Sequence, residues 1–132
     1  MLLRQLAFAS RARLGLRTAH TSELIATSRS NNARDGITGV LLYSGESFLQ
    51  IIEGRDAAIG HLWRRLLLDD RHRELTTLFE RSGDRWFDDW RAGYVAELKL
   101  GPQLLRWRAL APSLPPDDIT QIRDLCDGVE TF

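Results

Sequence analysis

One stretch of the chain decides the fold: NNARDGITGVLLY at residues 31–43, followed after Ser44-Gly45-Glu46 by SFLQIIEG at residues 47–54. Its two apolar runs are rich in branched and aromatic side chains, which β-strands favour, and the small and polar residues between them are typical of a turn. We predict a β-hairpin. Because side chains alternate along a strand, Gln50 shares a face with apolar neighbours.

Three amide side chains stand beside or within this hairpin: Asn31, Asn32 and Gln50. A buried carboxamide that loses water without regaining hydrogen bonds costs on the order of 1 to 3 kcal/mol. An Asn at the end of a helix can be only a stop signal, and a strand Gln can be satisfied by backbone. Those explanations account for one or two amides, whereas three that converge favour a planar polar ligand.

The flanking sequence predicts the remaining elements of one sheet. Residues 2–9 read as a first strand and residues 11–18 as a loop, followed by a helix that Thr21 or Ser22 caps and that Asn31 and Asn32 close. A second helix is expected over residues 56–68, where apolar residues recur with the helical period.

Two more strands are expected at residues 75–80 and 91–98, separated by the aromatic loop 86–90. The resulting order, β-α-β-β-α-β with one more strand, predicts an α+β fold of the ferredoxin-like group, with two helices on one face of a mostly antiparallel sheet. After Gly101-Pro102, two C-terminal helices are expected at 103–110 and 117–127. Their apolar surplus predicts that they cover the open sheet face or form a homodimer contact.

Composition narrows the class of protein. The chain has 132 residues, which fits one domain, and 18 Lys and Arg balance 18 Asp and Glu, so no net charge directs it to nucleic acid or a membrane. A single cysteine, Cys126, forms no internal disulfide and fits a reducing cytoplasm. We expect no signal peptide, no membrane span and a cytoplasmic location.

Motifs of common enzyme classes are missing from the sequence. It has no phosphate-binding Gly-x-x-x-x-Gly-Lys, no Gly-x-Ser-x-Gly, and only three scattered histidines, which predict no metal site. A small hydrolase on a ferredoxin-like fold, of the acylphosphatase kind, needs an anion-binding loop with paired Arg and Asn that the sequence lacks. We therefore expect no enzyme.

Several motifs nevertheless occur in one characteristic order: Asn31-Asn32, GITG at 36–39, FLQ at 48–50, Glu53-Gly54, DDRH at 69–72 and Phe87-x-x-Trp90. In this pattern the chain, over residues 1 to 95, resembles the BLUF domain, a flavin-binding blue-light sensor. The resemblance implies FAD between the two helices, with Asn32 and Gln50 at the polar ring edge. It implies further polar contacts from Asn31 and Arg65, and Ile25 and Leu66 on either side of the ring.

The chain departs from the family at two positions. The photoactive Tyr of the family, which passes an electron and a proton to the excited flavin, is matched by Phe8, which has no hydroxyl to give. Ala92 stands where many members carry Met, two residues after Trp90, on the route that the resemblance implies from Gln50 to the last strand. An engineered dark-state lock explains Phe8 alone, and the second departure fits natural divergence at least as well.

These observations predict a flavin-binding sensory domain at 1–98 with a helical extension at 99–132. Its photochemistry is expected to be impaired by Phe8, and Phe8 itself is expected to pack near the flavin. Its output is expected to reach an unidentified protein partner through the C-terminal helices. The alternative keeps the fold without flavin, as a scaffold or interaction protein. The yellow colour of bound flavin separates the two.

Overall fold

The structure is a computed structural model that describes residues 2–13 and 18–128, with the side chains of residues 18–21 excepted. Five strands form one sheet in the order β4-β1-β3-β2-β5, in which β2 and β5 are parallel and all other neighbours antiparallel. The strands are β1 (Leu3–Ala12), β2 (Thr38–Tyr43), β3 (Ser47–Gly54), β4 (His72–Gly83) and β5 (Trp90–Tyr94). The helices are α1 (Thr18–Arg34), α2 (Asp56–Leu68), α3 (Glu97–Leu110) and α4 (Pro116–Asp127). The ferredoxin-like α+β prediction is confirmed.

The predicted hairpin is β2 and β3. The hydroxyl of Ser44 accepts a hydrogen bond from the Ser47 backbone N–H at 2.9 Å and so closes the turn. Close packing of the two strands depends on Gly39, because a Cβ there would lie 1.9 Å from the carbonyl oxygen of Ile51. The hairpin is therefore predicted by the sequence, and its close strand packing requires a glycine whose replacement by a larger residue would destabilise the fold.

Helix α2 has the predicted bounds, but α1 does not. It begins at Thr18, before the expected caps Thr21 and Ser22, and continues past Asn31 and Asn32 to Arg34. The helix ends because Gly36 adopts a left-handed φ of 69°, which lets the Ile37 N–H reach back to the Asn32 carbonyl at 2.9 Å. The stop signal is thus Gly36, and the two amide side chains are not needed for it.

The expected fifth strand is too long. Strand β5 ends at Tyr94, and α3 begins at Glu97, so Leu98 is a helical residue and is 94% exposed. Gly101 and Pro102 lie inside α3, where we expected them to precede it. The buried residues of α3 recur with helical spacing through this Pro: Leu100, Leu104 and Trp107. That buried stripe explains why helix prevails over strand here.

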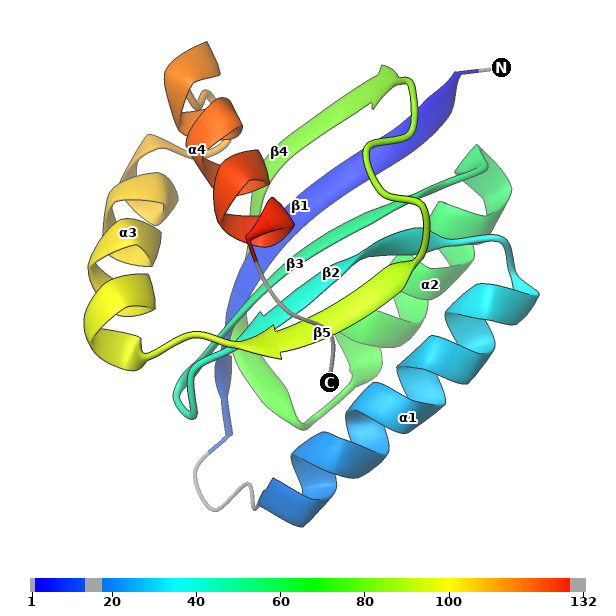
Figure 1. Ribbon diagram of the computed structural model, residues 1–132, viewed down its shortest axis with the longest axis horizontal. Helices are drawn as coiled ribbons and strands as arrows, with labels where there is room; N and C mark the ends of the chain where they lie inside the picture. The colour runs from blue at the N-terminus through cyan, green and yellow to red at the C-terminus, as the bar shows by residue number, and fades with distance from the viewer. Residues whose placement is uncertain (1, 14–17, 129–132) are drawn as a thin grey trace.

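Two helix layers cover the two faces of the sheet (Figure 1). Helices α1 and α2 pack on one face, and α3 and α4 bury an apolar cluster on the other, in which Trp107 is 1% exposed. Arg106 of α3 donates to the buried Asp118 carboxylate of α4 at 2.8 Å and joins the two helices. Of the two alternatives for the C-terminal helices, the structure shows the one in which they cover the open sheet face.

One buried carboxylate fixes the loop between β4 and β5. Both oxygens of Glu53 accept hydrogen bonds, from the Thr38 hydroxyl at 2.7 Å, the Gln5 amide at 2.7 Å, and the backbone N–H groups of Trp86 at 2.8 Å and Phe87 at 2.7 Å. A buried charge needs such complete pairing. The loop that leads to β5 is therefore held against the hairpin.

Among the described helices, none combines the length and the apolar content that a membrane crossing requires. Nor do the described His, Cys, Asp and Glu residues form a group of three or more that could hold a metal ion.

Candidate functional site

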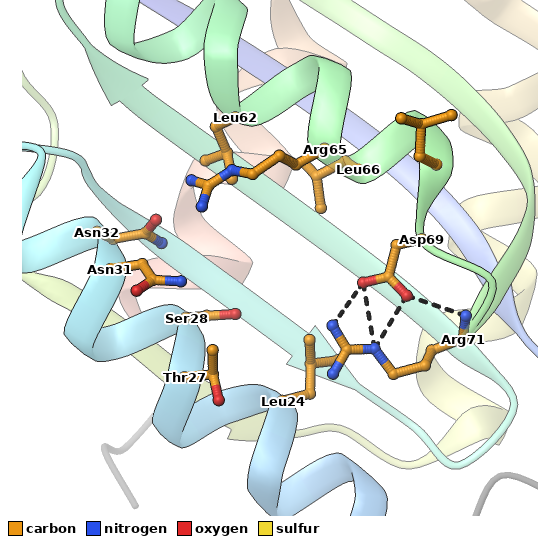
Figure 2. A pocket seen from close by; sticks show the side chains of 11 residues that line it. Leu24, Thr27, Ser28, Asn31, Asn32, Leu62, Arg65, Leu66, Asp69 and Arg71 are labelled. Carbon is orange, nitrogen blue, oxygen red and sulfur yellow. Dashed lines mark hydrogen bonds and ion pairs between the residues drawn. The ribbon is translucent and has the colours of Figure 1, made fainter.

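A pocket of about 390 Å³ opens between α1 and α2 on the face of the sheet that these helices cover (Figure 2). Side chains of α1 form one wall, and α2 with the loop after it forms the other. The lining residues are Leu24, Thr27, Ser28, Asn31, Asn32, Leu62, Arg65, Leu66, Leu68, Asp69 and Arg71. The pocket thus combines apolar surface from four leucines with polar and charged side chains that could fix the orientation of a small molecule.

Asn32 is the polar group of the α1 wall that most needs a ligand. Its side chain is 1% exposed, and both its Nδ2 and its Oδ1 are buried without a hydrogen-bond partner in the described residues. Leaving such an amide unpaired costs on the order of 1 to 3 kcal/mol. Asn31, one residue earlier, also lines the pocket and is partly exposed. Asn32 therefore presents one donor and one acceptor group for a ligand edge.

Arg65 faces Asn32 from α2 (Figure 2). Its guanidinium NH2 lies 3.7 Å from Asp35, which is an ion pair but not a hydrogen bond. Both Nε and NH2 are buried without a hydrogen-bond partner in the described residues. The α2 wall therefore offers donors, with Leu62 and Leu66 beside them as apolar surface.

Gln50 lies in a narrower space of about 30 Å³ that adjoins the pocket and shares several of its walls, including Leu24, Ser28 and Leu66. Gln50 is a residue of β3, so it borders this space from the sheet, on the side opposite the two helices. The structure therefore brings Asn31, Asn32, Arg65 and Leu66 together around one pocket, with Gln50 in its inner extension.

His72 and Ser10 form a second polar pair in that inner extension. His72 Nε2 lies 2.7 Å from the Leu66 carbonyl, which can only accept, so this nitrogen carries the proton. His72 Nδ1, 2.9 Å from the Ser10 hydroxyl, then accepts from it in the neutral ring. His72 belongs to the DDRH motif at 69–72, but neither that motif nor the resemblance assigned it a place beside Gln50.

Asp69 and Arg71 of the same motif form part of the pocket wall, a role that the sequence did not predict for them. A run of charges after a helix is typical of solvent-exposed loops, yet these two side chains bond each other at 2.6 Å and line the pocket (Figure 2). Burial raises the pKa of Asp69, but the hydrogen bonds and charge of Arg71 outweigh it, so this pKa lies below its usual value. The pair stays ionised and fixes the loop after α2.

Phe8 lies beside the site and does not line either space. Its ring is 1% exposed and packs in an apolar cluster with Leu62 and Ile59 of α2. The ring of Trp63 meets it edge-on, with centroids 5.3 Å apart. Phe8 therefore occupies an apolar place next to Gln50, its partner across the β1–β3 pair.

The remaining predicted residues, Ile25 of α1 and Trp90 and Ala92 of β5, do not line the pocket. Ile25, Trp90 and Ala92 belong to an apolar cluster with Leu41 and Phe48. The same cluster contains Leu24, and Phe48 lines the narrow space beside Gln50. The structure therefore connects Trp90 and Ala92 to the site through intervening side chains.

The pocket suits a flat molecule that has hydrogen-bond donors and acceptors along one edge and apolar faces. Comparison with known proteins gives such a family: the model described as "BLUF: Sensors of blue-light using FAD" matches residues 3–93. That range contains every residue that lines the pocket.

Two individual proteins are similar in sequence to part of this chain. The photoactivated adenylate cyclase subunit beta of Euglena gracilis is 33% identical over 76 residues, which are 58% of this chain and 9% of that protein. The blue light- and temperature-regulated antirepressor BluF of Escherichia coli (strain K12) is 27% identical over 75 residues, 50% of this chain and 19% of that protein. This chain therefore corresponds to a small part of both.

One solved structure is similar to this chain over most of the length of both chains. The dark-state structure of BlrB, a BLUF protein, superposes with a TM-score of 0.73 at 33% identity and covers 92% of each chain. The family match covers most of this chain, and the fold agrees with it. The chain belongs to the BLUF family of blue-light sensors that use flavin.

Proposed function

We propose that this chain is a flavin-dependent sensory module that holds FAD between α1 and α2 and whose usual light-driven switch is blocked at Phe8. When bound, a flavin supplies absorption of blue light and an excited ring that accepts an electron. The residues of this chain bind the ring, orient it and exclude water from its polar edge.

The observation that carries the proposal is the unpartnered amide of Asn32, buried in the wall of the pocket. A flavin ring edge has alternating carbonyl oxygens and ring nitrogens, and an amide with one donor and one acceptor group matches such an edge. Gln50 and Arg65 supply further polar groups around the same space, and Leu66 supplies apolar contact. Asn31 is the outer polar contact, and Ile25 supports the α1 wall from its cluster.

The block at Phe8 follows from its chemistry. A phenyl ring has no hydroxyl proton to transfer and donates an electron much less readily than a phenol. Its place across from Gln50 therefore leaves that amide without a hydroxyl partner from this position. We infer that Gln50 keeps one hydrogen-bonding arrangement in light and darkness.

The module acts through protein contacts, not by catalysing a reaction. The cyclase subunit and the antirepressor are longer proteins, of which this chain matches a small part. The sequence of this chain contributes no nucleotide-binding motif of its own. The route for output runs from Gln50 through Trp90 and Ala92 toward a protein partner at the C-terminal helices, within the cytoplasm, and the block at Phe8 holds this route in one state.

Reconstitution with flavin tests the proposal. The chain is refolded with excess FAD, desalted, and examined by absorbance at the blue flavin band, with FMN and riboflavin in parallel. We expect stoichiometric uptake, strongest for FAD. Asn32→Leu should lower the affinity about tenfold or more, since a buried hydrogen bond lost with its partner left unpaired costs about 1 to 3 kcal/mol.

Asn31→Leu is the matched control, because it removes the neighbouring and partly exposed amide and should weaken binding less. If the unmodified chain takes up none of the three flavins, the flavin-free scaffold is the correct reading. Equal uptake by Asn32→Leu and the unmodified chain would show that Asn32 does not hold the ring.

A further inference from the structure

A second hollow, of about 520 Å³, lies on the other side of α1 from the flavin pocket. Arg29 and Ala33 of α1 line it, and they are placed by the helical period on the face opposite Ser28 and Asn31. The start of β2 and the loop before β5 form its other walls, and its lining shares no residue with the flavin pocket. It is therefore a separate space.

Two hydrogen-bond donors in the lining of this hollow have no partner among the described residues. Trp90 is 5% exposed, and its indole Nε1 is buried and unpaired. The NH2 group of Arg29 is likewise buried and unpaired. An indole N–H and a guanidinium can only donate. Both groups therefore require an acceptor that the described part of the chain does not supply.

The other charged groups of the hollow have partners or lie at its rim. The guanidinium of Arg85 donates to the Thr38 hydroxyl and to the Gly36 carbonyl, and Thr38 in turn is held by Glu53. Asp89 pairs with Arg91 at 3.0 Å, and Asp88 is exposed. The walls are thus fixed independently of Arg29 and Trp90.

We propose that this hollow binds the carboxylate group of a small molecule, through Arg29 and Trp90. A guanidinium matches the two oxygens of a carboxylate, and charge-assisted bonds of this kind are stronger than neutral ones. Phosphate offers similar acceptors, but the exposed Asp88 at the rim repels a doubly charged group more than a singly charged one. Carboxylate is therefore the class of ligand that satisfies both donors at the lower electrostatic cost.

The test follows the indole N–H signal of Trp90 by ¹H–¹⁵N NMR of the full chain, assigned by its loss in Trp90→Phe. Sodium acetate is titrated against sodium phosphate and sodium chloride at matched ionic strength. We expect a saturable shift with acetate and a weaker one with phosphate. Arg29→Gln should lower the acetate affinity about tenfold, in line with the loss of one charge-assisted bond.

Arg64→Gln is the matched control, because Arg64 is an exposed arginine of α2 outside this hollow. It should leave the titration unchanged. Arg29→Lys keeps the positive charge but not the planar guanidinium, so its acetate affinity should be intermediate. This variant replaces Arg29→Gln in the test if Arg29→Gln folds poorly. No saturable shift with acetate, an equal shift in Arg29→Gln, or tighter binding of phosphate would overturn the proposal. None of these readouts depends on flavin.

Discussion

Phe8 and Gln50 lie directly opposite each other on β1 and β3, and both side chains are on the sheet face that α1 and α2 cover. Side chains of directly opposed residues are about 5 Å apart at Cβ, so each is part of the other's immediate surroundings. On its other side Phe8 faces Thr77 of β4. The position next to the Gln50 amide is therefore occupied by an apolar ring.

Gln50→Leu should weaken flavin binding or shift the flavin absorption. The substitution keeps the size of the side chain and removes one polar group from the inner extension of the pocket, at a cost of about 1 to 3 kcal/mol. Fluorescence titration with FAD and the absorption spectrum of the complex measure both effects. An unchanged affinity together with an unchanged spectrum would remove Gln50 from the site.

Gly39→Ala should be among the most destabilising substitutions in the hairpin. A Cβ at this position would lie 1.9 Å from the Ile51 carbonyl oxygen and would require the paired strands to separate. We expect a loss of about 3 kcal/mol or more in the free energy of unfolding, measured with urea.

Gly36→Ala is the control for this prediction. Gly36 also has a positive φ, of 69°, but an added Cβ would meet no atom within 4 Å. It should cost only about 1 to 2 kcal/mol, the penalty of a left-handed backbone for a residue with a side chain. Equal losses for the two variants would show that contact with Ile51 is not the cause.

Trp107→Ala should destabilise the whole chain by about 3 to 5 kcal/mol, since it leaves a cavity between α3 and the sheet. Trp107 is 1% exposed and packs in the apolar cluster on the sheet face that α3 and α4 cover. It is therefore a core residue of the described structure. Leu105→Ala is the matched control: Leu105 is exposed on the same helix and should change stability little. Comparable urea midpoints for both variants would contradict this assignment.

The Asp69 and Arg71 pair should make stability depend on pH. Because the pKa of Asp69 is lowered in the folded chain, the pair stabilises the fold above the ordinary Asp pKa of about 3.9, and this contribution is lost as the pH falls through the folded pKa. Asp69→Asn should cost about 1 kcal/mol at pH 7. The difference from the unmodified chain should shrink as the pH falls through the lowered folded pKa of Asp69, and a difference of the same size at every pH would show another cause.

Several elements could be predicted because their patterns are local. Helix α2 has its predicted bounds since its apolar residues repeat with one period, and the hairpin follows from two β-rich runs around a turn. The predicted start of α1 was wrong because its first residues, TAHTS at 18–22, contain no repeating apolar residues that would indicate a helix. The predicted end of β5 was wrong because Pro102 suggested a boundary between Leu98 and a later helix, whereas α3 runs through it.

The site was only partly predictable for a related reason. Asn32 and Gln50 belong to motifs with a fixed order, and the resemblance also implies Arg65, so all three could be indicated before the structure placed them around connected spaces. Asp69, Arg71 and His72 stand in a charged run whose local pattern is that of solvated loops. Only the packing of this loop against α1 and β1 reveals them as walls of the site.

The block at Phe8 is tested by the blue-light difference spectrum of the flavin-loaded chain, recorded beside that of Phe8→Tyr. The unmodified chain should show flavin fluorescence, or at most slow reduction by Trp90, and no reversible red shift. Phe8→Tyr restores a hydroxyl across from Gln50 and should restore the reversible red shift, because a switch needs a group that biases its two states. A normal reversible red shift in the unmodified chain would show that Phe8 does not block the switch.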